Sequence, residues 1–297
     1  MKYIKYFIEF LFIISLFAIF KIIGLKNASA LGEKIGIAIG PLFRSKTIIR
    51  KNINFAFPNI NSSDEKKIIK GMWSNYGRTF AEYVFLNKFS KNSPEQLISI
   101  QGKDILDKIK EKNESVVFVS GHFANFELMA MQLSNHGINL SAIYRPLNNI
   151  FLNPLMEYLR IKYICPSQIK KGRAGMREIL KKIQEKHSIA LMIDQRVTEG
   201  EKVLFFNQPA YTTTIPAQIA LKFRSKIVPI SLKRTSDVKF NMVVEKPIDV
   251  ERSENQNKDI LDISIKLNSV IENMIKNNPD QLYLPIHQLN LKIFHYL

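Results

Sequence analysis

The segment SVVFVSGHFANFELM, residues 115–129, decides the fold of this 297-residue chain. An apolar run rich in β-branched residues is followed by Gly121 and then by a helix-like pattern, which is the strand, turn and helix order of an α/β domain. His122 falls where the strand ends, and ligands of α/β sheets bind at the carboxyl ends of strands. Because Gly121 permits a sharp turn, we expect the imidazole to lie in a cleft at that edge.

The rest of the chain alternates between strand-like and helix-like segments. We predict strands at 115–120, 140–144, 189–193, 227–232 and 240–244, and helices near 125–135, 153–161, 175–185, 214–223 and 259–277. No repeat of fixed period and no Gly/Ser linker interrupts this pattern. We therefore expect a single α/β domain over residues 27–297, with a mixed central sheet flanked by helices.

The amino terminus carries an apolar run from Tyr3 to Ile23, close to the length of about 20 residues that spans a bilayer. A cleaved signal peptide is the alternative, but no small-residue cleavage site follows Lys21. We therefore predict a retained membrane anchor at residues 1–26. The glycines at positions 32, 36 and 40 allow close approach of a helix to a neighbour, in the bilayer or in a soluble core.

The composition of the chain indicates the kinds of partner, the compartment and the cofactors to expect. The formal charge of +17, from 43 basic and 26 acidic residues, predicts attraction to an anionic membrane, a phosphorylated substrate or nucleic acid, although a bias toward Lys, Ile and Asn explains part of the excess. Cys165 is the single cysteine, so no disulfide forms within the chain and a cytosol-facing body is the simpler expectation. The five histidines are scattered without the close spacing of a zinc site, so we expect no metal and no cofactor.

His122 and Glu127 are the candidate catalytic pair. An imidazole accepts a hydroxyl proton near neutral pH, and a carboxylate on its other nitrogen fixes the tautomer. A purely helical path would rotate the two side chains apart, so they meet only if the loop folds back. The alternative is a structural turn histidine followed by an acidic residue that favours a helix amino terminus.

The His-x4-Glu spacing after an apolar strand resembles the late acyltransferases of lipid A, the lauroyl and myristoyl transferases of Gram-negative bacteria. The likeness also covers the apolar amino terminus and five ordered blocks. These blocks are NINFAFPN (52–59) with WSNYGRTFAEY (73–83), GHFANFE (121–127), YRPLNN (144–149), MIDQR (192–196) and LFFNQPAYTTT (204–214).

The resemblance implies a fold like that of the glycerolipid acyltransferases, with His122 and Glu127 as the catalytic dyad. It implies an acyl carrier protein thioester as donor, a phosphorylated lipid A precursor as acceptor, and a place in the inner membrane with the domain facing the cytoplasm. Basic side chains suit such a polyanion, and Asp194 and Gln195 match the family's strand-end acidic motif. The substrate-binding candidates are Arg145, Lys170, Lys171, Arg173, Asp194 and Gln195.

The sequence departs from the family's pattern at two places that bear on the acyl acceptor. Asn207 replaces a glycine that commonly follows the paired aromatics, and the closing motif is reduced to PDQLYLPIHQLN (279–290). A glycerophospholipid or other glycolipid acyltransferase is the nearest alternative. A lipid hydrolase using Ser120 lacks the G-x-S-x-G elbow. A basic membrane-surface protein without catalysis explains the charge but not the His122 segment, and we see no nucleic-acid-binding motif.

Overall fold

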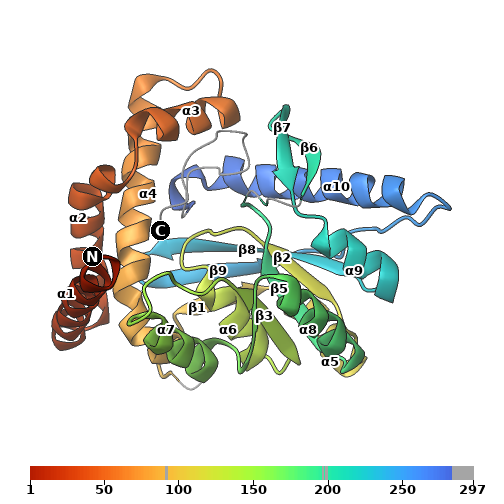
Figure 1. Cartoon of the computed structure of the whole chain (residues 1–297), viewed down its shortest axis with the longest axis horizontal. Helices are drawn as coiled ribbons and strands as arrows, with labels where there is room; N and C mark the ends of the chain where they lie inside the picture. Colours follow the sequence, from red (N-terminus) through yellow and green to blue (C-terminus); the bar gives the residue numbers. More distant parts are fainter. Residues whose placement is uncertain (91–92, 196, 198–199, 283–297) are drawn as a thin grey trace.

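The computed structural model describes residues 1–90, 93–195, 197 and 200–282, with the side chain of Arg173 outside this set. Seven strands form a sheet in the order β1-β9-β8-β2-β5-β3-β4, and β6 and β7 form a separate antiparallel hairpin. All neighbours in the large sheet are parallel except β8 and β9. The predicted α/β fold with a mixed central sheet flanked by helices is confirmed (Figure 1).

The strands are β1 (Ile98–Gln101), β2 (Val117–Ser120), β3 (Leu140–Tyr144), β4 (Ser167–Lys170), β5 (Ser188–Met192), β6 (Glu201–Phe205), β7 (Gln208–Thr212), β8 (Ile227–Ser236) and β9 (Lys239–Val244). The helices are α1 (Lys2–Ile23), α2 (Leu25–Phe43), α3 (Lys46–Ala56), α4 (Ser62–Glu82), α5 (Lys103–Glu111), α6 (Glu127–Asn135), α7 (Asn153–Leu159), α8 (Arg173–Gln184), α9 (Ile215–Phe223) and α10 (Gln256–Asn277). Short helical segments η1 (Tyr83–Phe89), η2 (Arg160–Ile164) and η3 (Pro279–Gln281) complete the described elements.

Two apolar cores lie on opposite faces of the sheet. Phe118 of β2 packs with α5 and α6, whereas its neighbours Val117 and Val119 pack with α8, α9 and α10. This alternation follows from the period of two along a strand. Since both faces of β2 are covered, its four residues are all buried, which explains its uninterrupted apolar sequence.

The amino-terminal helices form a layer beside the sheet, where α4 stands between them and the strands (Figure 1). Helices α2 and α4 pack so closely that a Cβ added at Gly36 would overlap the Trp73 carbonyl oxygen, and one added at Gly77 would overlap the Gly32 carbonyl oxygen. The glycines at 32, 36 and 40 thus serve helix packing inside the protein, one of the two roles that their spacing predicted.

Helix α1 is long and apolar enough to cross a membrane, with a mean hydropathy of 2.3, and only 11% of its most apolar window is buried. Its inner side is fixed to the body, because Phe17 and Phe20 are buried and Phe17 lies 5.1 Å from the Phe80 ring. The outer side presents a row of exposed apolar residues: Tyr3, Ile4, Phe7, Ile8, Leu11, Phe12, Ile19 and Ile22.

Each predicted strand and helix has a counterpart, and most boundary errors are one to three residues. The helix expected near 125–135 begins at Glu127, and the loop before it contains Ala124 with a positive φ of 49°, which a right-handed helix does not accommodate. Four strands were not predicted, β1, β4 and the β6–β7 hairpin. In the hairpin turn Asn207 has φ 58°, so the residue that departs from the family's glycine retains the conformation that glycine favours.

Candidate active site

The predicted site residues gather at one edge of the sheet because their strands are neighbours. Strands β2 and β5 pair in parallel with Ser120 opposite Met192, so His122 and Asp194 each lie two residues beyond a paired position. Strands β3 and β4 pair with Tyr144 opposite Lys170, so Arg145 and Lys171 each follow a paired position by one residue. The four strands β2, β5, β3 and β4 are consecutive in the sheet, and their carboxyl ends carry these side chains.

His122 is held by both oxygens of Asp194. Its Nδ1 lies 2.7 Å from Asp194 Oδ1, and its main-chain N–H donates to Asp194 Oδ2 at 2.8 Å. Gly121 permits this approach, since a Cβ there would lie 3.3 Å from Asp194 Oδ2 and 2.5 Å from the Phe123 ring. The carboxylate on the Nδ1 side of His122 is therefore that of Asp194, at the position where we had expected Glu127.

The charge of Asp194 defines the tautomer of His122. Burial alone would raise the pKa of Asp194, but the charge of His122 and the hydrogen bonds from its ring and main chain outweigh burial and lower that pKa. An ionised Asp194 accepts only, so in the neutral form of the imidazole Nδ1 carries the ring hydrogen and Nε2 has a free lone pair. Among the described residues no hydrogen bond to Nε2 is formed, which leaves this nitrogen available to a substrate hydroxyl.

Glu127 is the first residue of α6 and is paired with Arg160 and Tyr83. Its Oε1 accepts from Arg160 Nε at 3.0 Å and from Nη2 at 2.6 Å, and it also accepts from the Tyr83 hydroxyl. Burial, followed by the nearby Glu127 charge, raises the pKa of Tyr83, so the phenol keeps its hydrogen. Burial would lower the pKa of Arg160, yet the Glu127 charge and the hydrogen bonds to Glu127 and Tyr83 outweigh it and raise that pKa.

Arg160 extends the polar site toward the ends of β3 and β4. Its guanidinium lies 5.6 Å from the centre of the Tyr144 ring, and Tyr144 donates to Glu157, which pairs with Lys170 at 3.2 Å. Arg160 begins η2, a π-helical segment, and such segments are frequent at functional sites. Arg160 Nη1 is buried and has no hydrogen-bond partner in the described part of the chain, and an unsatisfied buried donor of this kind is uncommon.

The other candidate binding residues lie along the same edge. Arg145 and Lys171 are exposed, and desolvation followed by the Arg145 charge lowers the pKa of Lys171. Gln195 is partly buried next to Asp194. Arg173 begins α8, but its side chain lies outside the described set.

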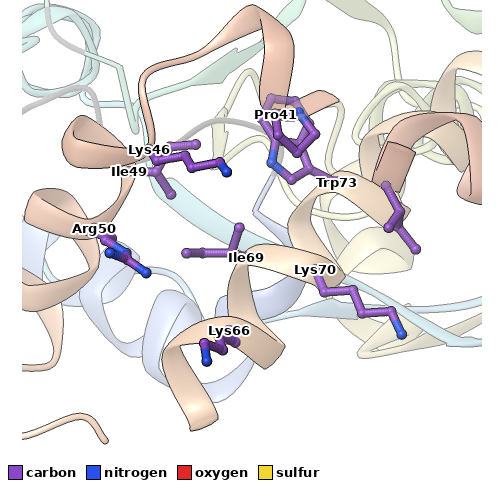
Figure 2. Close-up of a pocket in the computed structure, with 9 residues that line it drawn as sticks. Pro41, Lys46, Ile49, Arg50, Lys66, Ile69, Lys70 and Trp73 are labelled. Carbon is purple, nitrogen blue, oxygen red and sulfur yellow. The ribbon is translucent and has the colours of Figure 1, made fainter. Parts of the chain in front are cut away.

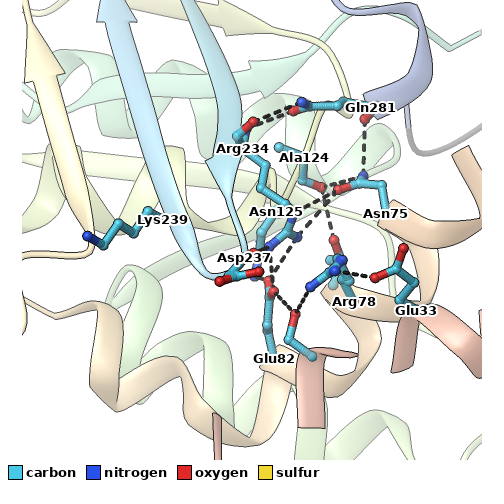
Figure 3. Close-up of polar contacts among 12 residues, drawn as sticks. Glu33, Asn75, Arg78, Glu82, Ala124, Asn125, Arg234, Asp237, Lys239 and Gln281 are labelled. Carbon is cyan, nitrogen blue, oxygen red and sulfur yellow. Dashed lines mark hydrogen bonds and ion pairs between the residues drawn. The ribbon is translucent and has the colours of Figure 1, made fainter. Parts of the chain in front are cut away.

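The loop from His122 to Glu127 is clamped from two sides. The Ala124 carbonyl accepts from Asn75 Nδ2 at 3.1 Å and from Thr79 Oγ1 at 3.0 Å, both on α4 (Figure 3). The Ala124 N–H donates to the Gln281 carbonyl at 2.8 Å. These bonds hold Ala124 in its left-handed conformation, which a non-glycine residue adopts only when its surroundings require it.

A buried ion pair supports the clamp. Glu82 is fully buried and pairs with Arg234 at 2.6 Å, while Asn125 Nδ2 donates to the second Glu82 oxygen at 3.0 Å (Figure 3). Ser29 of α2 donates to Glu82 at 2.8 Å, and Arg78 connects Ser29 to Glu33. The amino-terminal helices and the carboxyl end of β8 are thereby joined to the loop that carries His122.

Sequence reasoning singled out His122 as catalytic and Asp194 as a substrate-binding candidate, but it did not predict their contact. It also missed Arg160, Tyr83 and the supporting residues Asn75 and Glu82. The segment WSNYGRTFAEY (73–83) contains Asn75, Glu82 and Tyr83 and was noted only for its resemblance. Its spacing is a usable signal, since Asn75, Thr79 and Glu82 share one face of a helix at i, i+4 and i+7. Polar residues at this spacing in an otherwise apolar region indicate a buried polar face.

The fold and the site together define an α/β protein with a buried histidine–aspartate contact at the carboxyl edge of a mixed sheet. Residues 1–292 match the sequence model of the family described as bacterial lipid A biosynthesis acyltransferase, which covers nearly the whole chain. The chain therefore belongs to this family of acyltransferases, and the resemblance seen in the sequence is confirmed.

Named relatives act in the same pathway. The chain is 24% identical over 265 residues to the lipid A biosynthesis palmitoleoyltransferase of Escherichia coli, which is 87% of this chain and 83% of that protein. It is 20% identical over 201 residues to the lipid A biosynthesis myristoyltransferase of the same bacterium, which is 65% of this chain and 59% of that protein. A lipid A biosynthesis acyltransferase of Shigella flexneri matches at 24% identity over 265 residues.

Proposed function

We propose that the protein transfers a fatty acyl group from an acyl carrier protein thioester to a hydroxyl of a phosphorylated lipid A precursor. Membership of the family supports the acceptor class. The observation that carries the mechanism is the 2.7 Å contact between His122 Nδ1 and Asp194, because it leaves Nε2 as a base at the sheet edge.

In this mechanism the hydroxyl oxygen attacks the thioester carbonyl while His122 Nε2 takes the hydroxyl proton. Asp194 stabilises the imidazolium that forms. The tetrahedral intermediate collapses with cleavage of the C–S bond, and the carrier thiolate leaves and recovers the proton from His122. Arg145 or main-chain amides stabilise the oxyanion. No covalent acyl-enzyme is required.

Glu127 is proposed as the second catalytic residue, acting through Arg160 rather than on the imidazole. Its double contact fixes the guanidinium plane, and the unpaired Nη1 of Arg160 is a donor for an acceptor oxygen. Arg145, Lys170, Lys171, Arg173 and Gln195 are proposed to contact the phosphorylated sugar.

We further propose that residues 1–26 anchor residues 27–297 to the inner membrane, with the catalytic domain in the cytoplasm. Helix α1 has the length and hydropathy of an anchor. Cys165 is a buried free thiol, as expected for a protein in a reducing compartment.

The test incubates detergent-solubilised protein with a panel of acyl carrier proteins and either a Kdo-bearing lipid A precursor or lysophosphatidate, with products read by mass. We expect acylated precursor, and at least about a hundredfold less of it with His122→Ala, the usual contribution of a general base. His136→Ala is the matched control, since His136 pairs with Asp107 at 2.8 Å away from the site. Full activity of His122→Ala would exclude the mechanism, and acylation of lysophosphatidate alone would exclude the acceptor.

A further inference from the structure

The amino-terminal layer has a cavity of about 250 Å³ between α2, α3 and α4, and its accessible lining is almost wholly apolar (Figure 2). The lysines beside it, Lys46, Lys66 and Lys70, point away from one another. These ammonium groups therefore do not converge on a lipid head group, as the cations of a head-group site do. The exposed apolar side chains of the protein are its candidates for contact with lipid.

Helix α1 is held along one side by the rest of the protein. Its Tyr6 carbonyl accepts from Asn149 Nδ2 at 2.8 Å near one end, and Lys21 donates to the Val84 carbonyl at 3.1 Å near the other. Between these contacts α1 packs into the apolar core through Phe17 and its partly buried neighbours. A helix that crosses a bilayer alone has hydrocarbon on all sides over about 20 residues. Only the outer side of α1 is available to lipid.

The outer side of α1 is apolar over most of the helix. Within α1, which the structure describes in full, no charged residue lies on this side between Lys5 and Lys21. Glu9, the acidic residue of α1, is partly buried and accepts from Asn149 Nδ2 at 3.3 Å. The exposed large side chains recur at helical spacing: Ile4, Ile8, Leu11, Phe12, Ile19 and Ile22.

The segment that follows β3 exposes a second apolar stripe beside α1 (Figure 1). Its exposed side chains recur at i, i+3, i+7 and i+10 on one face of the turn, α7 and η2: Phe151, Pro154, Tyr158 and Ile161. Phe151 joins this α7 stripe to α1, because its ring centre lies 5.4 Å from that of Phe7 and 6.3 Å from that of Phe10. Two segments far apart in sequence thus form one exposed apolar surface, and such surfaces mark interaction sites.

Lysine and tyrosine border this surface. At the end of the α7 stripe, Lys162 Nζ donates to the Tyr158 hydroxyl at 2.8 Å. At the start of α1, Lys2 lies over the Tyr6 ring at 5.6 Å. Tyrosines and lysines at the edge of an apolar surface are typical of the head-group level of an anionic membrane, and the chain carries a net charge of +17. The composition of the surface and of its border therefore fits a lipid layer.

The opposite side of the α7–η2 segment belongs to the candidate active site. Glu157 accepts from the Tyr144 hydroxyl at 2.7 Å. Arg160 donates to Glu127 at 2.6 Å and is only 12% exposed, whereas the next residue, Ile161, is 51% exposed. One short segment thus has a polar side at the site and an apolar side facing outward.

We propose that α1 lies along the membrane surface rather than across it, and that the α7 stripe enters the same lipid layer beside α1. The proposal rests on the membrane anchoring proposed above and adds residues 150–161 to the anchor at residues 1–26. The α7–η2 segment then contacts lipid with one side and the candidate active site with the other.

Fluorescent labels on single introduced cysteines measure the depth of each position. The variants are Ile4→Cys, Phe12→Cys, Ile22→Cys, Ile150→Cys and Ile161→Cys, each in the full chain reconstituted into vesicles of phosphatidylglycerol and phosphatidylethanolamine. The quencher is a nitroxide on a lipid, placed either near the head group or at the end of the acyl chain. We expect the shallow nitroxide to quench all five labels more than the deep one, since a segment in the interface is buried by about 5–10 Å.

Two controls accompany the labels. Ile265→Cys is matched to Ile150→Cys, because Ile265 is 48% exposed and Ile150 is 51% exposed. Ile265 lies on α10, which packs on the opposite face of the sheet from α1 and α7, so neither nitroxide should quench its label. The wild type should take up no label, because its single cysteine, Cys165, is buried.

The outcomes separate the proposal from the anchoring on which it rests. Strongest quenching of the Phe12 label by the deep nitroxide would show that α1 spans the bilayer, which would overturn the arrangement along the surface. Quenching of the α1 labels without those at positions 150 and 161 would leave the anchor standing and overturn the role of the α7 stripe. Absence of quenching at all five positions would overturn the anchor itself. A label at position 150 that is shielded from water but not quenched by lipid would overturn the lipid assignment in favour of a protein partner.

Discussion

Asp194 contacts His122 twice, at the ring Nδ1 and at the main-chain N–H. The position and the tautomer of His122 therefore depend on a single carboxylate. The two residues come from strand ends separated by 72 positions in sequence and are brought together by the β2–β5 pairing.

Replacement of Asp194 by Asn should lower kcat by about 10²–10⁴-fold, because the amide does not enforce the hydrogen on Nδ1. The turnover of acyl carrier thioester measures this change. Asp107→Asn is the control, since Asp107 forms a His–Asp contact of similar length with His136. Undiminished turnover of Asp194→Asn would show that the contact does not serve catalysis.

Asp194 should also make stability depend on pH. Its folded pKa is lowered, so its stabilisation is complete above the unfolded value of about 3.9 and is lost as pH falls through the folded pKa. We expect the difference in Tm between the wild type and Asp194→Asn to be largest near neutral pH and to shrink in acid. A difference that grows as pH falls would contradict the lowered pKa.

Removal of either partner of the Glu127–Arg160 pair should be costly, since both side chains are about 90% buried (9% and 12% exposed). Glu127→Gln should lower the free energy of unfolding by about 3–5 kcal/mol, as an uncompensated charge remains. Adding Arg160→Met should recover part of this loss in a double-mutant cycle. Denaturant titration in detergent measures the free energy of unfolding of the wild type and of each variant.

The control for this pair is Lys170→Gln, which removes the Lys170–Glu157 pair. Lys170 is 62% exposed, so the change should cost less than about 1 kcal/mol. If the losses in free energy of unfolding from Glu127→Gln and Arg160→Met simply added in the double variant, the two side chains would not stabilise each other.

Gly77→Ala should destabilise the protein by about 1–3 kcal/mol or more, because the new Cβ would overlap Gly32 and force α2 away from α4. Ser269→Ala on the exposed side of α10 should stay within about 0.5 kcal/mol. Thermal unfolding of both variants gives the comparison. If Gly77→Ala matched Ser269→Ala, the close packing of α2 on α4 would not contribute to stability.

Much of the fold was predictable because the buried strands and amphipathic helices show clear periods. The unbroken apolar run of β2 predicted a buried strand, and the position of His122 directly after that run predicted a site residue. Strands β1 and β4 were missed since each has only four residues, several of them polar or half-buried, and short mixed segments carry little periodicity.

The site was partly predictable for a similar reason. His122, Asp194 and Arg145 follow strands that are apolar in sequence, and parallel pairing brings such positions together. Lys171 was singled out only as a basic residue, because the strand before it, β4, was not predicted. The contact between Glu127 and Arg160 was not predictable, because it depends on how α6 and η2 pack, and one sequence contains no measure of that distance.

The way α1 is fixed to the body has a consequence for substrate access. Asn149, in the turn after β3, donates to the Tyr6 carbonyl at 2.8 Å, and Lys21 donates to the Val84 carbonyl at 3.1 Å. Helix α1 is therefore fixed to the rest of the protein near both of its ends. In the proposed anchoring, the depth that α1 adopts in the lipid layer therefore sets the height of the His122 edge of the sheet above that layer.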